Sequence, residues 1–184
     1  MKDDLSNILL EISLKEYEKL KDEQTQRIGF RDNMLYVTLV AIGGLVSFAV
    51  GSPNKHAALL LVPWVCIILG WTYLVNDEKI SSIGKYLRAK LNEKIRQNMD
   101  LSERVLLGWE LEHRSDMRRV QRKIIQCLVD VFAFTLPGIL SIAIYLYLDQ
   151  PHWLLKIIGM LEVFLLVGLG FEFIVYADFK KGRE

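Results

Sequence analysis

Residues Ala57 to Val75 read AALLLVPWVCIILGWTYLV, a run of 19 residues without one charged side chain. The hydrocarbon core of a bilayer is about 30 Å thick, and a helix needs about 20 residues to cross it. A helix satisfies all of its backbone hydrogen bonds within such a run, and the alternating pattern of a membrane barrel strand is absent. The run therefore predicts a transmembrane helix.

Three further apolar runs lie along the chain. They cover residues 34–50, 127–148 and 153–176, so that the spans pair into hairpins at 34–75 and 127–176. The third run carries one acid, Asp130, and the fourth carries three charged residues, among them Glu162 and Glu172. A soluble bundle of very apolar helices is the alternative, but uncharged runs of about 18 residues rarely occur in soluble cores. We expect an all-α integral membrane protein with four transmembrane helices.

The basic residues lie on one side of these spans. Twelve lysines and arginines fall in the connection 76–126, whereas the connections 51–56 and 149–152 hold one and none. Five more lie between residues 15 and 31, and three lie in the tail 177–184. Because lysine and arginine favour the cytoplasmic side, both termini and residues 76–126 are predicted to be cytoplasmic. The compact four-span arrangement suits a bacterial inner membrane.

The cytoplasmic segments also have helical patterns. Residues 5–30 are amphipathic and lead into the first span, and apolar residues recur at spacings of three and four from Ile80 to Met99. A capping box at Asp100 and Glu103 precedes a third helix that runs into the third span. We expect these extensions, within residues 1–33 and 76–126, to form a cytoplasmic helical bundle. The alternative is that the first helix lies flat on the membrane surface.

The composition argues against several other classes of protein. Two cysteines cannot supply a disulfide scaffold or a cysteine zinc site, and a net charge of +1 gives no case for direct nucleic-acid binding. The sequence has no nucleophile elbow, phosphate-binding glycine loop or metalloprotease motif, so we expect neither an enzyme nor a cofactor. His56 and His152 lie in the two external connections, but two histidines without a third ligand make a poor metal site.

Glu162 is the most informative charged residue. It lies nine residues after the start of the fourth span, about 14 Å into the membrane. A carboxylate there costs on the order of 2.5–3.5 kcal/mol unless it is protonated, paired or hydrated. It either lines an ion or proton path, for example as a ring of acids in an oligomer, or holds helices together as a protonated acid with Thr135 or Ser141 as partner. Asp130 and Glu172, near the cytoplasmic span ends, are expected to reach headgroup water or to pair with basic residues.

Two basic clusters precede the first and third spans. The first is Arg27 and Arg31, and the second comprises Arg114, Arg118, Arg119, Arg122 and Lys123. Each basic residue beside an anionic bilayer contributes about 1 kcal/mol of attraction, and such residues are ordinary at the cytoplasmic flank of a span. The alternative is contact with a phosphate-bearing ligand or with an acidic surface of a cytosolic protein, because planar guanidinium groups suit phosphate.

The order of elements and the juxtamembrane run EYEKLKDEQTQRIGFRDN, at 16–33, resemble small four-span proteins that act as effectors or accessory subunits of bacterial antiviral defence systems. The resemblance implies an oligomeric membrane effector that opens or depolarises the bilayer on a cytoplasmic cue. The membrane-embedded acid and the large helical cytoplasmic half favour the same interpretation: a homo-oligomeric pore, channel or membrane-disrupting protein controlled through its cytoplasmic helices. The alternative is a non-conducting scaffold that recruits a cytosolic partner to the membrane.

Overall fold

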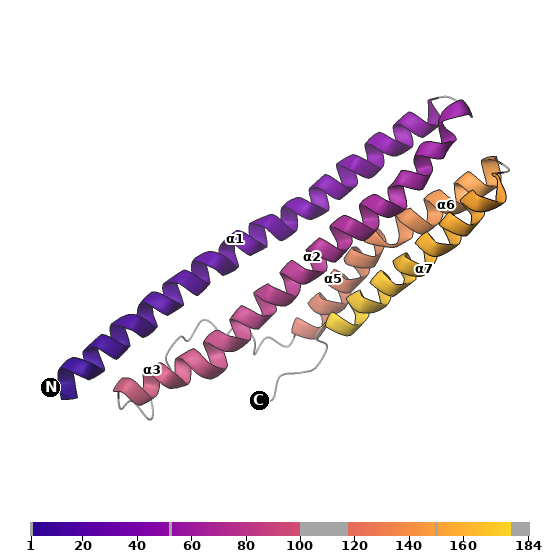
Figure 1. Ribbon diagram of the computed structural model, residues 1–184. Helices are drawn as coiled ribbons and strands as arrows, with labels where there is room; N and C mark the ends of the chain where they lie inside the picture. Colours follow the sequence, from indigo (N-terminus) through magenta and orange to yellow (C-terminus); the bar gives the residue numbers. More distant parts are fainter. Residues whose placement is uncertain (1, 52, 100–117, 150, 178–184) are drawn as a thin grey trace. The chain divides into compact units, whose positions relative to one another are not determined.

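The computed structural model describes residues 2–51, 53–99, 118–149 and 151–177, and all the elements within these ranges are helical (Figure 1). In chain order they are α1 (Lys2–Val50), the 3-10 helix η1 (Pro53–Leu60), α2 (Leu61–Tyr86), the π-helical turn η2 (Leu87–Leu91), α3 (Asn92–Met99), α5 (Arg119–Phe134), α6 (Leu136–Leu148) and α7 (Trp153–Tyr176). The predicted all-α class is confirmed.

Four helical stretches among the described residues are long and apolar enough to cross a membrane. They are Asn7–Val50, Lys55–Gln97, Val120–Leu148 and Trp153–Tyr176. Each of these stretches contains one of the four predicted spans, so the prediction of four apolar helices of spanning length is confirmed.

Two prolines disturb the regular α-helix inside the predicted spans. The second span starts within the 3-10 helix η1, and Pro63 lies in the first turn of α2, where it has no N–H to donate to the carbonyl four residues before it. In the third span the α-helix is interrupted at Thr135, between α5 and α6, where Pro137 removes a hydrogen bond in the same way. The interruption is a single residue wide, and the backbone hydrogen bonds Thr135 N–H to Val131 O and Ile139 N–H to Thr135 O keep the helical spacing on both sides of it.

The described chain forms two compact units, which we call unit 1 and unit 2. Unit 1 takes its described residues from 1–30 and 76–119, and unit 2 takes them from 31–75 and 120–181. The helices α1 and α2 each contribute residues to both units.

Unit 1 pairs the first part of α1 with the end of α2, with η2 and with α3 in antiparallel fashion. The side-chain amide of Gln24 donates to the carbonyl of Ile80 at 3.2 Å, and the guanidinium of Arg27 donates to Asn76 Oδ1 at 3.2 Å. The shared apolar core consists of Leu87, Leu91 and Ile95, with Leu10, Tyr17 and Leu20 of α1 packed against it. The two amphipathic patterns thus bury their apolar sides against each other. Of the third helix predicted for the bundle, residues 100–117 lie outside the described part of the chain.

Unit 2 has an apolar core built from all four of these long apolar stretches. Its buried residues fall into three clusters: Tyr73, Leu74, Ala133, Phe134, Leu169 and Phe173; Val62, Cys66, Ile142 and Leu166; and Ala49, Leu59 and Tyr145. The helices approach closely at Gly70, where an added Cβ would lie 2.8 Å from Leu169 Cδ2 and 3.0 Å from Phe134 Cβ. This close packing leaves little room for a polar group, which makes Glu162 an unusual member of the interior.

Candidate functional site

Glu162 lies on the face of α7 that points into unit 2. Its side chain is 0% exposed, and it shares this face with the buried residues Gly159 and Leu166. Leu166 belongs to the apolar cluster formed with α2 and α6, and a Cβ on Gly159 would lie 3.3 Å from Ile142. The neighbouring turns on either side of Glu162 are therefore in contact with aliphatic groups of the other helices.

The carboxyl group of Glu162 has no hydrogen bond to any other described residue. Neither of its oxygens has a hydrogen-bond partner among the described residues, and the indole N–H of Trp64 on α2 approaches it without reaching hydrogen-bond geometry. The partners expected from the sequence do not reach it. Ser141 donates its hydroxyl to the carbonyl of Gly138 at 2.8 Å, and the buried Thr135 hydroxyl also has no hydrogen-bond partner in the described part of the chain.

This arrangement has a clear chemical consequence. Burying a neutral polar group without a hydrogen bond costs about 1–3 kcal/mol in proteins, and burying an unpaired charge costs much more. The ion pairs found among the described residues do not include Glu162. The described conformation therefore suits the protonated acid, and ionisation would require water, a cation or a rearrangement of the helices around it.

A cluster of polar side chains in unit 2 lies around Asp130, whose side chain is 8% exposed. The side-chain amide of Gln126, one turn earlier on α5, donates to Asp130 Oδ1 at 2.9 Å and to the hydroxyl of Tyr73 at 2.8 Å. The guanidinium of Arg31 lies 5.9 Å from the centre of the Tyr73 ring and donates to Asp32 Oδ1 at 3.0 Å. We expected headgroup water or a basic residue as the partner of Asp130. Gln126 is a partner of Asp130 that we did not predict, although its spacing of four residues from Asp130 is a recognisable helical pair.

Glu172 has a different environment from the two buried acids. Its side chain is partly exposed on the last turns of α7, and no ion pair joins it to another described residue. Among the basic residues near it in the sequence, Lys180 lies outside the described residues.

The first basic cluster takes part in contacts within the chain. Arg27 bonds to the carboxylate of Glu23 at 2.6–2.8 Å as well as to Asn76, and both contacts are inside unit 1. Arg31 takes part in the group around Tyr73 in unit 2. These contacts orient both guanidinium groups, and the proposed contact with lipid, ligand or partner stays a prediction.

The second basic cluster is only partly within the described residues. The side chains of Arg118 and Arg122 are exposed, and Lys123 is half-buried at the beginning of α5. Arg114 lies outside the described part of the chain, as does the side chain of Arg119. Two exposed guanidinium groups at the start of the third spanning helix are compatible with either of the roles expected for them.

Two further polar contacts were not expected. In unit 2, His56 Nδ1 lies 3.3 Å from Asp149 Oδ1, which links the two hairpin connections, whereas the His152 ring packs against Trp153. The two histidines therefore have separate partners. In unit 1, the Tyr86 hydroxyl donates to Glu16 Oε1 at 2.6 Å, and Lys94 donates to Glu16 Oε2 at 3.3 Å.

The contact between Tyr86 and Glu16 affects the acidity of both groups. The hydrogen bond from Tyr86, helped by Lys94, lowers the pKa of the Glu16 carboxyl. The same bond raises the pKa of the Tyr86 hydroxyl, because the bond needs the hydroxyl proton. The bond between Tyr86 and Glu16 therefore needs an ionised carboxylate and a protonated hydroxyl.

A comparison with known proteins would have to match three features: the four long apolar helices, the buried acid inside unit 2 and the paired helices of unit 1. Neither the protein-family models, nor the curated proteins, nor the solved structures compared with this chain give a match.

Proposed function

We propose that this chain is a multi-pass membrane protein that conducts ions or permeabilises its membrane, and that unit 1 controls this activity. The observation that carries the proposal is the buried Glu162 carboxyl, which has no hydrogen-bond partner within the described ranges. An ionisable group inside a membrane is costly, and such groups mark ion or proton pathways in membrane proteins. A packing role alone gives no reason to retain an acid where leucine would fit.

The outward surface of unit 2 supports membrane insertion. Large apolar side chains such as Val40, Phe164 and Tyr147 are 76%, 74% and 88% exposed. Soluble monomers rarely expose contiguous apolar patches larger than a few hundred Å². Lipid is the solvent that suits such a surface, with the basic flanks and both termini on the cytoplasmic side of a bacterial inner membrane.

The orientation of Glu162 bears on the state of the protein. An oligomer with a ring of acids needs this carboxyl at a surface shared between subunits, whereas here it faces the interior of unit 2. We infer that the described conformation is the closed one, and that opening turns or shifts α7 so that the carboxyl meets water or a cation. The least covered spanning helix is α1, since 11% of its most apolar stretch is buried, against 33–39% in the other three. This makes α1 the first candidate for contact between subunits.

Unit 1 is suited to a control function because of its connection to the spans. Both α1 and α2 pass from unit 1 into unit 2 within a single helix. A ligand or protein that separates the paired helices of unit 1 would act directly on the first two spans. A role in antiviral defence rests on the resemblance of the architecture to membrane effectors and belongs to the same proposal.

The experiment is an ion-flux measurement with purified protein in liposomes that contain a pH-sensitive or potassium-sensitive dye. We compare the wild type with Glu162→Gln and with Glu172→Gln, a matched control that removes a partly exposed acid from the same helix. We expect a low flux from the wild type through spontaneous opening of the closed state, a severalfold change in this flux in Glu162→Gln and little change in Glu172→Gln. Equal flux from all three proteins would refute the role of Glu162.

A scaffold that recruits a cytosolic protein is the second candidate. It predicts that liposomes stay tight even when the bound protein is present, and that Glu162→Gln leaves recruitment unchanged. Two exposed arginines at the start of α5, Arg118 and Arg122, are the groups that would contact an acidic partner. Their replacement by glutamate would then abolish recruitment to membranes.

A further inference from the structure

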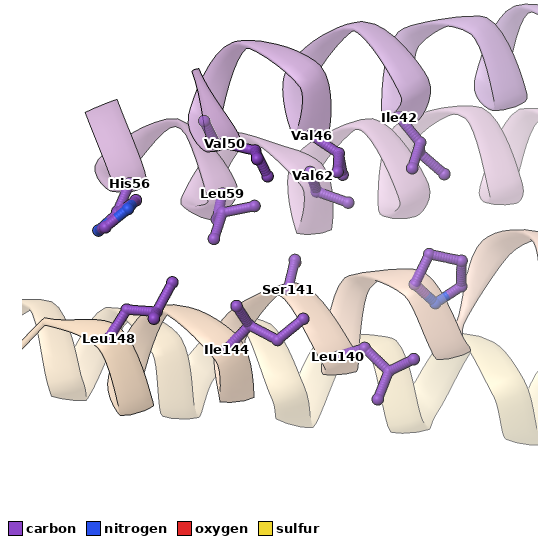
Figure 2. A pocket seen from close by; sticks show the side chains of 12 residues that line it. Ile42, Val46, Val50, His56, Leu59, Val62, Leu140, Ser141, Ile144 and Leu148 are labelled. Atoms are coloured by element: carbon purple, nitrogen blue, oxygen red, sulfur yellow. The ribbon is translucent and has the colours of Figure 1, made fainter. Parts of the chain in front are cut away.

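Unit 2 contains an apolar cavity that is separate from Glu162. It has a volume of about 370 Å³ and is partly open to the outside. Twelve residues line it, and all but His56 and Ser141 are apolar. Figure 2 shows its two walls: Ile42, Val46 and Val50 of α1, together with Leu59 and Val62, face Leu140, Ile144 and Leu148 of α6.

We propose that this cavity binds one acyl chain of a phospholipid from the outer leaflet of the membrane. The proposal rests on the membrane insertion proposed above and adds a specific lipid site to it. Protein interiors are packed to nearly crystalline density, so a cavity of this size in an aliphatic wall calls for an occupant. The medium that surrounds the four spanning helices supplies one of matching chemistry.

The dimensions of the cavity match one leaflet. Along α6 its wall extends from Pro137 to Leu148, which is about 16 Å at the rise of an α-helix. Half of a hydrocarbon core of about 30 Å is about 15 Å, the depth that one acyl chain occupies. The cavity is therefore long enough for one chain in one leaflet and too short to cross the bilayer.

One of the two polar lining residues, His56, lies at one end of the cavity, as an amphiphile requires. His56 lines the end next to Leu148 (Figure 2), and its Nδ1 lies 3.3 Å from Asp149. Lys55 is adjacent in the chain, with its Nζ 4.7 Å from the centre of the Phe48 ring. The other polar lining residue, Ser141, uses its hydroxyl within α6. A headgroup at this end would lie next to Lys55, His56 and the Asp149 carboxylate, which suits the two opposite charges of a zwitterionic phospholipid, and the chain below it would meet aliphatic groups.

The test is photolabelling of the full chain in nanodiscs. The nanodiscs contain phosphatidylethanolamine with a diazirine either near the carbonyl end or at the methyl end of one acyl chain, and labelled peptides are mapped by mass spectrometry. We expect labelling of residues 42–62 and 137–148 severalfold above that of the outward face of α7. The carbonyl-end probe should label close to Leu148 and the methyl-end probe close to Ile42. Equal labelling of every outward apolar face would overturn the lipid site while leaving membrane insertion intact.

A cavity-filling variant gives an independent result. Val46→Phe places an aromatic ring in the cavity, and the matched control Val40→Phe makes the same change on the same helix at a residue outside the lining. Labelling of the cavity should fall severalfold in Val46→Phe and stay unchanged in Val40→Phe. If Val46→Phe does not fold, the depth dependence of labelling in the wild type decides the question. Cross-links between two copies through α1 and α6, with lipid labelling of other apolar faces but not of the cavity, would show that a second chain fills the cavity instead. A wild type that no probe labels would refute membrane insertion itself.

Discussion

Replacing Glu162 by leucine should stabilise the protein. The carboxyl is fully buried and has no hydrogen-bond partner in the described chain, so its burial costs about 1–3 kcal/mol that leucine avoids. Leucine has a similar volume, and exchanges that conserve volume usually cost less than about 1.5 kcal/mol in packing. The turns of α7 next to Glu162 contact aliphatic groups, so a leucine side chain fits this environment and its packing cost should be near the lower end of that range. We therefore expect a net gain of about 1–2 kcal/mol.

Thermal unfolding in detergent micelles, followed by tryptophan fluorescence, measures this gain. For a chain of this size, a change of 1 kcal/mol shifts Tm by about 2–4 °C, so Glu162→Leu should raise Tm by about 2–8 °C. Glu162→Gln should stay close to the wild type, because its buried amide would lack partners as well. Glu172→Leu is the control, since it removes an acid at a partly exposed position on the same helix.

A clear loss of stability in Glu162→Leu would refute the reasoning. A fall in Tm of several degrees would mean that the carboxyl makes favourable contacts that hold the helices together. Glu162 would then be a structural acid, and the main support for the proposed ion pathway would disappear. The expected combination is a more stable protein with altered flux, as is common when a strained functional group is removed.

Two other perturbations test the packing of each unit. Gly70→Ala should destabilise unit 2 by about 1–3 kcal/mol, because its Cβ would lie 3.0 Å from the buried Phe134 Cβ. Gly43→Ala is the control: its Cβ would meet nothing within 4 Å, so in the same melting assay it should be neutral or slightly stabilising. Tyr86→Phe should destabilise unit 1 by about 1–2 kcal/mol through loss of the bond to Glu16. The wild-type bond needs ionised Glu16, with its lowered pKa, and protonated Tyr86, with its raised pKa. Its contribution is therefore complete between the ordinary values of 4.5 and 10.0, and is lost as pH falls through the pKa of Glu16 or rises through that of Tyr86. The difference between wild type and Tyr86→Phe should vanish at both extremes, and a difference independent of pH would contradict the assignment.

The spans could be predicted from the sequence because their signal is local. A run such as 57–75 is too long and too apolar for a soluble core, whatever it packs against. The helical pairing in unit 1 was also visible, because Leu87, Leu91 and Ile95 recur with the period of a helix and are buried as expected. The interruption at Thr135 follows from Pro137 by the same local reasoning.

The partners of the polar residues could not be predicted in the same way. Glu162 was placed near the membrane midplane by counting residues, but Thr135 and Ser141 were the wrong candidates for its partner. The pairs formed by His56 with Asp149 and by Tyr86 with Glu16 join residues that are 93 and 70 positions apart. No spacing rule connects such residues, because their distance depends on how the helices are rotated about their own axes.

Hydropathy, proline position and helical period, all of which are local properties, thus determined the helical class, the four apolar stretches and the apolar face of unit 1. The tertiary structure alone decided that Glu162 faces inward without a hydrogen bond and that an aliphatic cavity ends at His56. The physical reason is that a small rotation of an apolar helix changes its neighbours completely while its sequence stays the same. In an aliphatic environment, packing contacts at glycines such as Gly70 select one rotation, and these contacts exist only once the helices have come together.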